Sequence, residues 1–203
     1  MKKTIICLLL GLAVLIGYRL LIHKPDIQNT NPSGENIICF GDSLTYGTGA
    51  TAGMDYPSQL SGMISKPVIN AGVPGDTTAS ALARLEKDVL SRFPRIVLVA
   101  LGGNDLKNGV PSEDARHNLR IIIESIQNQG ALVIVGGIDI PFWGKGFGEI
   151  YKQLSNELGA VLIPNVLEGI IGNRRLMSDR IHPNNEGYTV MAQMFYEAIK
   201  PYV

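Results

Sequence analysis

Apolar residues along the chain form short continuous runs, and these runs alternate with segments in which apolar residues recur at helical spacing. The runs are predicted strands, because they are short, lack a polar face and are bounded by turn-forming residues. They span residues 36–40, 67–70, 95–101, 131–135 and 161–164. Helical spacing predicts helices over 56–64, 77–93, 151–158 and 185–199, and a further one capped by Ser112.

Alternating strands and helices predict an α/β fold. Strands without a polar face are typical of a parallel sheet that is covered by helices on both sides. We therefore expect a three-layer α/β/α sandwich with a five-stranded parallel sheet, similar to flavodoxin. Binding sites in such folds form outside the carboxyl ends of the strands, so the residues that follow each strand are the first candidates.

The first 24 residues have a different pattern. Lys2 and Lys3 precede an apolar stretch over residues 4–22 that is interrupted only near its end, by Arg19. Such a stretch is either a cleaved signal peptide or an uncleaved membrane anchor of about 20 residues. No small-x-small cleavage site follows it, which favours the anchor.

The chain therefore divides into an anchor or signal segment over 1–24, a polar linker over 25–35 and a domain over 36–203. We expect an exported protein that contacts the membrane through its N-terminal segment. It would be held at the cytoplasmic membrane and face the periplasm or exterior, or be secreted if the segment is cleaved.

Composition excludes several classes of protein. An apolar fraction of 45% with 18% charged residues predicts a well-packed core rather than disorder. Outside the first 24 residues, 14 basic residues face 18 acidic ones, a net charge of −4 that argues against binding of nucleic acid. Two cysteines exclude a disulfide-rich scaffold and a four-cysteine zinc site. We expect a monomer without cofactor or metal.

Four segments carry candidate chemistry. The predicted strands are followed by Gly-Asp-Ser-Leu at 41–44, by Gly72 and by Gly-Gly-Asn-Asp at 102–105. Asp179 and His182 precede the last predicted helix. The first three segments must lie at one edge of a parallel sheet, and the fourth is free to join them.

Together these residues could perform acyl transfer. Ser43 offers a hydroxyl nucleophile, His182 a base that takes its proton, and Asp179 a carboxylate that orients the imidazole. The backbone N–H groups of Ser43 and Gly72 and the side-chain amide of Asn104 are candidate donors to an oxyanion. Activity should then rise with pH as His182 loses its proton.

Other residues near these segments have less specific interpretations. Asp42 and Asp105 are expected to brace their turns rather than to react. The segment 141–148, after the fourth predicted strand, contains Phe142, Trp143 and Phe147. It is either a loop pinned by aromatic side chains or a wall that binds substrate, and its position at the sheet edge favours the wall.

Each segment alone is a weak signal, but the four in this order resemble the GDSL, or SGNH, hydrolase family. The family's four letters correspond to Ser43, Gly72, Asn104 and His182, and the match covers residues 37–199. Within the family, the chain is similar to the small bacterial arylesterase, lysophospholipase and acyl-thioesterase group, which is TesA-like. The resemblance implies a three-layer fold, a Ser-Asp-His triad, no metal and a shallow site for acyl esters and thioesters.

We therefore expect a serine esterase that hydrolyses acyl esters or thioesters through an acyl-enzyme intermediate. A membrane tether makes lysophospholipids candidate substrates. The alternatives are a carbohydrate O-acetyl esterase or acyltransferase of the same family, and a non-catalytic, membrane-tethered binding module.

Overall fold

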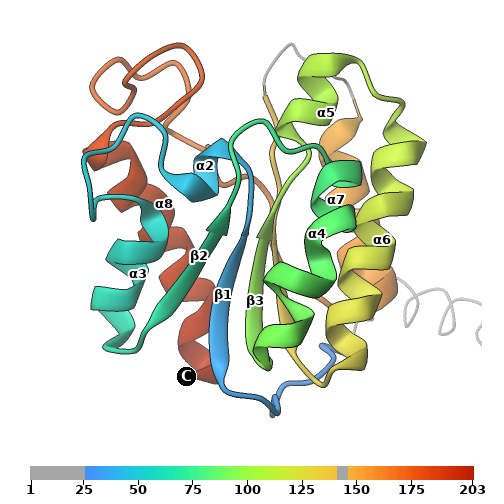
Figure 1. Ribbon diagram of the computed structural model, residues 1–203. Helices are drawn as coiled ribbons and strands as arrows, with labels where there is room; N and C mark the ends of the chain where they lie inside the picture. Colours follow the sequence, from blue (N-terminus) through green and yellow to red (C-terminus); the bar gives the residue numbers. More distant parts are fainter. Residues whose placement is uncertain (1–25, 141–145) are drawn as a thin grey trace, which may run out of the picture.

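Five parallel strands form a single sheet between two layers of helices (Figure 1). The computed structural model describes residues 26–140 and 146–203. The strands are β1 (Asn36–Gly41), β2 (Val68–Gly72), β3 (Pro94–Ala100), β4 (Leu132–Gly136) and β5 (Val161–Ile163). Their order in the sheet is β2-β1-β3-β4-β5, and every neighbouring pair is parallel. This order is flavodoxin-like, and the predicted three-layer fold is confirmed.

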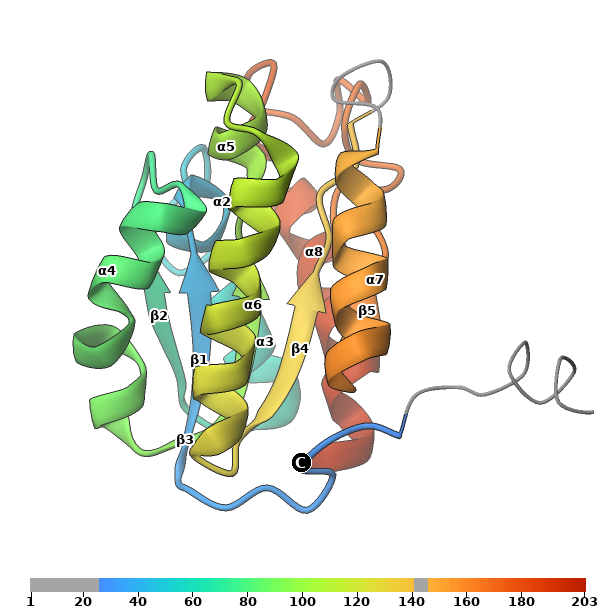
Figure 2. The same ribbon diagram turned by 90° about the vertical axis from the view of Figure 1, so that its right-hand side faces the viewer.

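Helices cover both faces of the sheet (Figures 1 and 2). One face carries α3 (Tyr56–Ile64) and α8 (Asn185–Ile199), and the other carries α4 (Thr78–Asp88), α6 (Ser112–Asn128) and α7 (Phe147–Leu158). The rings of Tyr56 and Phe195 stack at a centroid distance of 4.7 Å and join α3 to α8. The shorter helices are α2 (Ser43–Tyr46), α5 (Gly103–Asn108) and the 3₁₀ turns η1 (Leu90–Arg92) and η2 (Lys200–Tyr202).

Three predicted helix boundaries were wrong, and one of them is the start of α7, which begins at Phe147 rather than at residue 151. The helix expected over 77–93 ends at Asp88, because the chain turns at Val89 and buries that side chain in the core. Phe93 then adopts a left-handed conformation ahead of Pro94, a position where the right-handed helical conformation is disfavoured. Pro111 occupies the N-cap of α6, so Ser112 is the first helical residue and makes no side-chain cap.

The core lies on both faces of the central strands. Every side chain of β4 is buried, as are those of β3 from Ile96 onward. Cys39 of β1 is free and completely buried, as expected for a small core residue, and burial raises the pKa of its thiol far above the usual range. The apolar runs in the sequence therefore correspond to strands that are covered on both sides.

Residues 26–35, expected to form a linker, lie along the end of the sheet opposite to the carboxyl ends of the strands (Figure 2). We call this segment the strap. The Gln28 N–H donates to the Gly159 carbonyl at 2.8 Å. The Asn29 side-chain amide donates to the Gln127 and Ala131 carbonyls, both at 2.9 Å. These contacts hold the strap against the loops beneath α6 and α7.

Two expectations from the sequence fall outside the described residues. These are the anchor or signal segment over 1–24 and most of the aromatic segment over 141–148. None of the helices in the described part of the chain combines the length and the apolar character needed to span a bilayer.

Candidate active site

Ser43 lies where β1 passes directly into α2. A Cβ on Gly41 would lie 2.5 Å from the Ala100 carbonyl oxygen, so only glycine fits at the end of this strand. Asp42 then caps α2, and its carboxylate accepts a hydrogen bond from the Leu44 N–H at 2.9 Å. Ser43 is the first residue of α2 and is half-buried, so its hydroxyl is held at the sheet edge and remains accessible.

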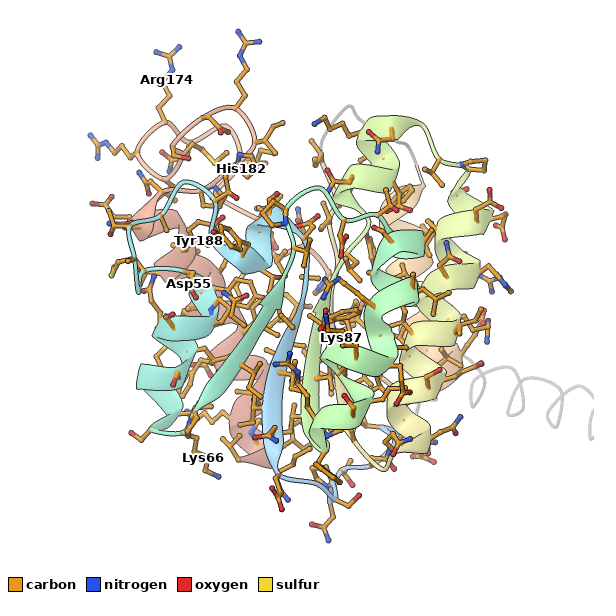
Figure 3. The ribbon with its side chains drawn as sticks, in the orientation of Figure 1. Asp55, Lys66, Lys87, Arg174, His182 and Tyr188 are labelled. Carbon is orange, nitrogen blue, oxygen red and sulfur yellow. The ribbon has the colours of Figure 1, made fainter. Side chains whose placement is uncertain are left out.

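His182 is presented by a tight turn ahead of α8. Met177 and Pro183 form an antiparallel bridge, and the Ser178 N–H donates to the His182 carbonyl at 2.9 Å. The turn brings His182 Nε2 to 3.1 Å from Ser43 Oγ, across 139 residues of sequence. His182 Nδ1 lies 2.8 Å from Asp179 Oδ2. The structure thus brings the three expected side chains into one hydrogen-bonded chain, with His182 near the carboxyl ends of the strands (Figure 3).

Asp179 is kept ionised by its hydrogen bonds. Its Oδ1 accepts from the N–H groups of Ile181 and His182, both at 2.7 Å, while Oδ2 faces the imidazole. The bond to the imidazole and then the two backbone bonds lower the pKa of this carboxyl to about 2. An ionised carboxylate has no proton to give, so Nδ1 must carry the proton that they share. The lone pair of Nε2 then faces the Ser43 hydroxyl.

Asn104 lies in the first turn of α5, directly after β3. Its side-chain Nδ2 donates to the Asp76 carbonyl at 2.9 Å and to Asp42 Oδ2 at 3.2 Å. Asp42 is 2% exposed, and burial raises the pKa of its carboxyl to about 6. Asp42 therefore contacts both the turn that carries Ser43 and the amide of Asn104.

Gly72, expected to donate to an oxyanion, has a different role in the structure. Its N–H donates to Asn70 Oδ1 at 2.9 Å, and it does not line the pocket described below. A Cβ on Gly72 would clash with the backbone of Tyr46, so this glycine lets β2 pack closely against α2.

Gly75 is a candidate oxyanion donor that the sequence analysis did not name. It has a φ of 86° in the turn from Val73 to Asp76, after Pro74. Among the described residues, none accepts a hydrogen bond from the Gly75 N–H or the Ser43 N–H. Gly75 directly precedes Asp76, whose carbonyl accepts from Asn104. The signal was present in the sequence, because Pro-Gly marks the two central positions of a type II turn.

Two buried clusters hold the loops that carry Ser43, Gly75 and Asn104. One consists of hydrogen bonds and the other contains an ion pair. Asp105 is fully buried and accepts from the Thr78 N–H at 2.8 Å and its hydroxyl at 2.6 Å, which ties α5 to α4 as a brace. Arg84 pairs with Asp76 at 2.5 Å and donates to the Gly41 carbonyl at 2.9 Å. The loops after β1, β2 and β3 are therefore linked to one another below the site.

A pocket of about 570 Å³ opens beside Ser43 and His182. Its walls are mostly apolar and include Ile138, Ile140, Leu167 and Ile171. In residues 26–140 and 146–203, no group of three His, Cys, Asp or Glu side chains is placed to hold a metal ion. Because its walls are mostly apolar, the pocket suits an apolar group that extends away from the Ser43 hydroxyl.

Of the three aromatic residues expected to form a wall, only Phe147 lies within the described residues. Phe142 and Trp143 lie outside the described residues. Phe147 is the first residue of α7, is 5% exposed and packs edge-on against Tyr151 at 6.2 Å. Its expected role in substrate binding is not supported, because its position four residues before Tyr151 directs both rings into the core.

The chain is similar in sequence and fold to several known proteins. The chain is 28% identical over 179 residues to "Thioesterase 1/protease 1/lysophospholipase L1" of Escherichia coli strain K12, covering 84% of this chain and 86% of that one. It is 31% identical over 178 residues to "Arylesterase" of Vibrio mimicus, covering 82% and 89%. The "Crystal Structure of TesA" matches with a TM-score of 0.79 at 26% identity, covering 83% of this chain and all of that one.

A more distant relative has a name of another kind. "Acetylxylan esterase" of Geobacillus stearothermophilus is 23% identical over 207 residues, covering 82% of this chain and 94% of that one. The family profile itself matches residues 39–190, a span that includes Ser43, Asn104 and His182. The chain therefore belongs to the GDSL-like lipase/acylhydrolase family and is an ester-hydrolysing serine hydrolase.

Proposed function

We propose that the protein hydrolyses acyl esters or thioesters with Ser43 as nucleophile, His182 as base and Asp179 as the group that orients His182. The observation that carries this proposal is the unbroken hydrogen-bonded chain from Ser43 Oγ through His182 to Asp179, at the mouth of an apolar pocket. A serine hydroxyl is a weak nucleophile until a neighbouring base takes its proton, and this chain supplies the base.

In the proposed first step, Ser43 Oγ attacks the substrate carbonyl carbon while its proton passes to His182 Nε2. The carbonyl oxygen becomes an oxyanion, which accepts hydrogen bonds from the Ser43 N–H and from the Asn104 amide, whose longer bond to Asp42, at 3.2 Å, gives way to the oxyanion. We add the Gly75 N–H in place of Gly72, because the Gly72 N–H is already bound to Asn70. The tetrahedral intermediate then expels the alcohol or thiol, which takes the proton from His182, and leaves an ester on Ser43.

In the second step, water replaces the leaving group. His182 takes a proton from the water as its oxygen attacks the acyl carbon, and the same oxyanion donors stabilise the second intermediate. The intermediate collapses to a free carboxylic acid, and Ser43 regains its proton from His182. Asp179 stays ionised throughout and stabilises the imidazolium that forms twice in each cycle.

The apolar pocket supports an acyl chain longer than acetyl. Six branched aliphatic side chains line it, and each buried methylene contributes about 0.8 kcal/mol, which is about fourfold in an equilibrium constant. Lysophospholipids and acyl thioesters, both in the name of the Escherichia coli relative, are therefore candidate substrates. The non-catalytic binding module is set aside, because the chain belongs to a hydrolase family.

A carbohydrate O-acetyl esterase is the second candidate, and the acetylxylan esterase relative favours it. An acetyl group would leave most of the apolar pocket unfilled. The two candidates therefore differ in how the rate depends on the length of the acyl chain.

The test is a series of p-nitrophenyl esters, from acetate to palmitate, with the full-length protein, together with labelling by a fluorophosphonate. We expect kcat/KM to rise severalfold for each added methylene over the short chains, because the pocket buries them. The phosphonate should label Ser43, identified by peptide mass spectrometry. A maximum at acetate, with hydrolysis of acetylated xylan, would favour the second candidate. A folded protein without turnover and without label on Ser43 would refute the mechanism.

Asp42→Asn tests how Asn104 is held in place. The substitution keeps an oxygen for the Leu44 N–H but turns an NH₂ group toward the Asn104 amide, so two donors face each other and the Asn104 side chain must move. We expect kcat to fall about tenfold or more with little change in KM, within the range for loss of an oxyanion donor. The measurement is steady-state kinetics of the single variants and of the double variant with Asn104→Ala.

The double variant separates positioning from a structural effect. If Asp42 acts through Asn104, Asp42→Asn has no further effect once Asn104 is alanine, and additive losses would contradict this role. Stability provides the second readout. Burial raises the pKa of Asp42 to about 6. Its favourable contribution to the free energy of unfolding is therefore complete below the ordinary pKa of an aspartic acid and is lost as pH rises through 6. The natural protein should therefore lose its stability advantage over the variant, in part or in full, as pH rises from about 4 to about 8.

A further inference from the structure

Two cations stand at the mouth of the otherwise apolar pocket. Lys107 of α5 and Arg180 of the turn before His182 both line it, and both are exposed. Neither forms an ion pair with any residue in the ranges 26–140 and 146–203. The nearby Asp179 carboxylate pairs with His182 and accepts from two backbone N–H groups, and it forms no ion pair with Arg180.

The two cations lie close in sequence to the groups that perform the chemistry. Lys107 is three residues after Asn104 in α5, so the two side chains share a face of that helix. Arg180 is two residues before His182. Both residues line the same pocket as Ser43, Asn104 and His182, whereas Ile138, Ile140, Leu167 and Ile171 belong to its apolar part.

The pocket offers little negative charge to oppose them. Asp42 is its one carboxylate among the described lining residues, and it is buried and bound to Leu44 and Asn104. The domain over 36–203 is acidic overall, so two unpaired cations at the mouth of its pocket run against its net charge. An anion would be attracted to this mouth in particular.

We propose that Lys107 and Arg180 bind an anionic group on the leaving side of the substrate, so that the enzyme selects anionic amphiphiles over neutral and zwitterionic ones. The substrate would place its acyl chain among the isoleucine and leucine side chains and its ester at Ser43. A phosphate on the leaving alcohol, a few bonds from the ester, lies between the two cations. This inference rests on the proposed function and names the class of substrate that the same site takes.

The test compares three lipids that share an octanoyl chain and differ in charge: octanoylglycerol phosphate, octanoylglycerophosphocholine and octanoylglycerol. All are used with the full-length protein below their critical micelle concentrations. We expect kcat/KM to be highest for the phosphate. In Lys107→Gln/Arg180→Gln the preference over octanoylglycerol should fall by about tenfold for each cation removed, a typical effect of a charge-assisted hydrogen bond. The rate on octanoylglycerol itself should change by less than about threefold, because that substrate has no charge to bind.

A matched control carries the same change in net charge. Arg174→Gln/Lys66→Gln removes one cation that projects from the same end of the domain as His182 and one at the far end (Figure 3). Neither residue lines the pocket. The control should retain the preference for the phosphate. Loss of the preference in the control as well would overturn the proposal, because the effect would then come from overall charge.

Two further arms separate the possible sources of failure. Calorimetric binding of the three lipids to Ser43→Ala gives a Kd without turnover, so the preference is measured even if the proposed mechanism fails. Hydrolysis of p-nitrophenyl octanoate without any preference among the lipids would overturn the cation site and leave the proposed function intact. Vesicles of phosphatidylglycerol or phosphatidylcholine test a lipid surface as the source of the anion. If only phosphatidylglycerol vesicles raise the rate of hydrolysis, and the enzyme shows no preference among the three monomeric lipids, the proposal that one anionic substrate molecule binds the two cations is overturned.

Discussion

Replacing Ser43 with alanine is expected to lower ester turnover by at least about 10³-fold, because the substitution removes the only atom that can form the acyl-enzyme. The Ser43 hydroxyl is half-buried, and its hydrogen bond to His182 is the contact that the substitution removes. Stability should therefore change little. The measurement is kcat/KM on the best p-nitrophenyl ester, together with thermal unfolding.

Ser91→Ala is the matched control. Ser91 is exposed, and its hydroxyl donates only to the Lys87 carbonyl, far from the pocket. This variant should keep full activity and full labelling by the phosphonate. Residual activity of Ser43→Ala above about a hundredth of the natural rate would mean that another group attacks the substrate.

Asp179→Asn is expected to lower kcat by about 10³- to 10⁴-fold, the loss expected when the imidazole is held in the wrong tautomer. The asparagine oxygen can still accept from the Ile181 and His182 N–H groups, so the turn should persist. The asparagine NH₂ group then points at His182 Nδ1 and makes that nitrogen an acceptor. Nε2 must carry the proton instead, and it can no longer take one from Ser43.

The control for this variant is Asp114→Asn, an exposed carboxylate in the first turn of α6. We expect the control to retain activity. Steady-state kinetics should show the loss for Asp179→Asn in kcat, and phosphonate labelling should slow in parallel, because both reactions need the same activated serine. A variant that reacts with the phosphonate at the natural rate would refute the orienting role of Asp179.

The sequence predicts most of this site because the topology leaves little freedom. Residues that follow parallel strands must lie at the same edge of the sheet, so the sequence alone predicts that Ser43 and Asn104 lie near each other. Asp179 and His182 were placed by their spacing and by Pro183, which keeps His182 out of the helix. The structure confirms the five-stranded parallel sheet and brings Ser43, His182 and Asp179 within hydrogen-bonding distance of one another.

The errors concern residues whose roles depend on local backbone geometry. Gly72 is the last residue of β2 and Gly75 lies in the turn that follows, and the partner of each N–H group distinguishes them. Phe147 belongs to an aromatic segment at the correct edge, but the helix begins there and turns its ring into the core. The described part of the pocket wall includes Ile138 and Ile140, which follow β4 without any distinctive motif.

The strap has a consequence for the direction in which this enzyme faces. The strap holds the N-terminal end of the domain at one end of the sheet, and α2, which begins with Ser43, lies at the opposite end. Between the two ends lies the full length of the sheet, about 23 Å along β3 alone at the usual rise per residue. If residues 1–24 hold the protein to a membrane, its pocket opens away from that membrane. The enzyme would then collect dispersed molecules from the surrounding solution rather than lipids from the bilayer beneath it.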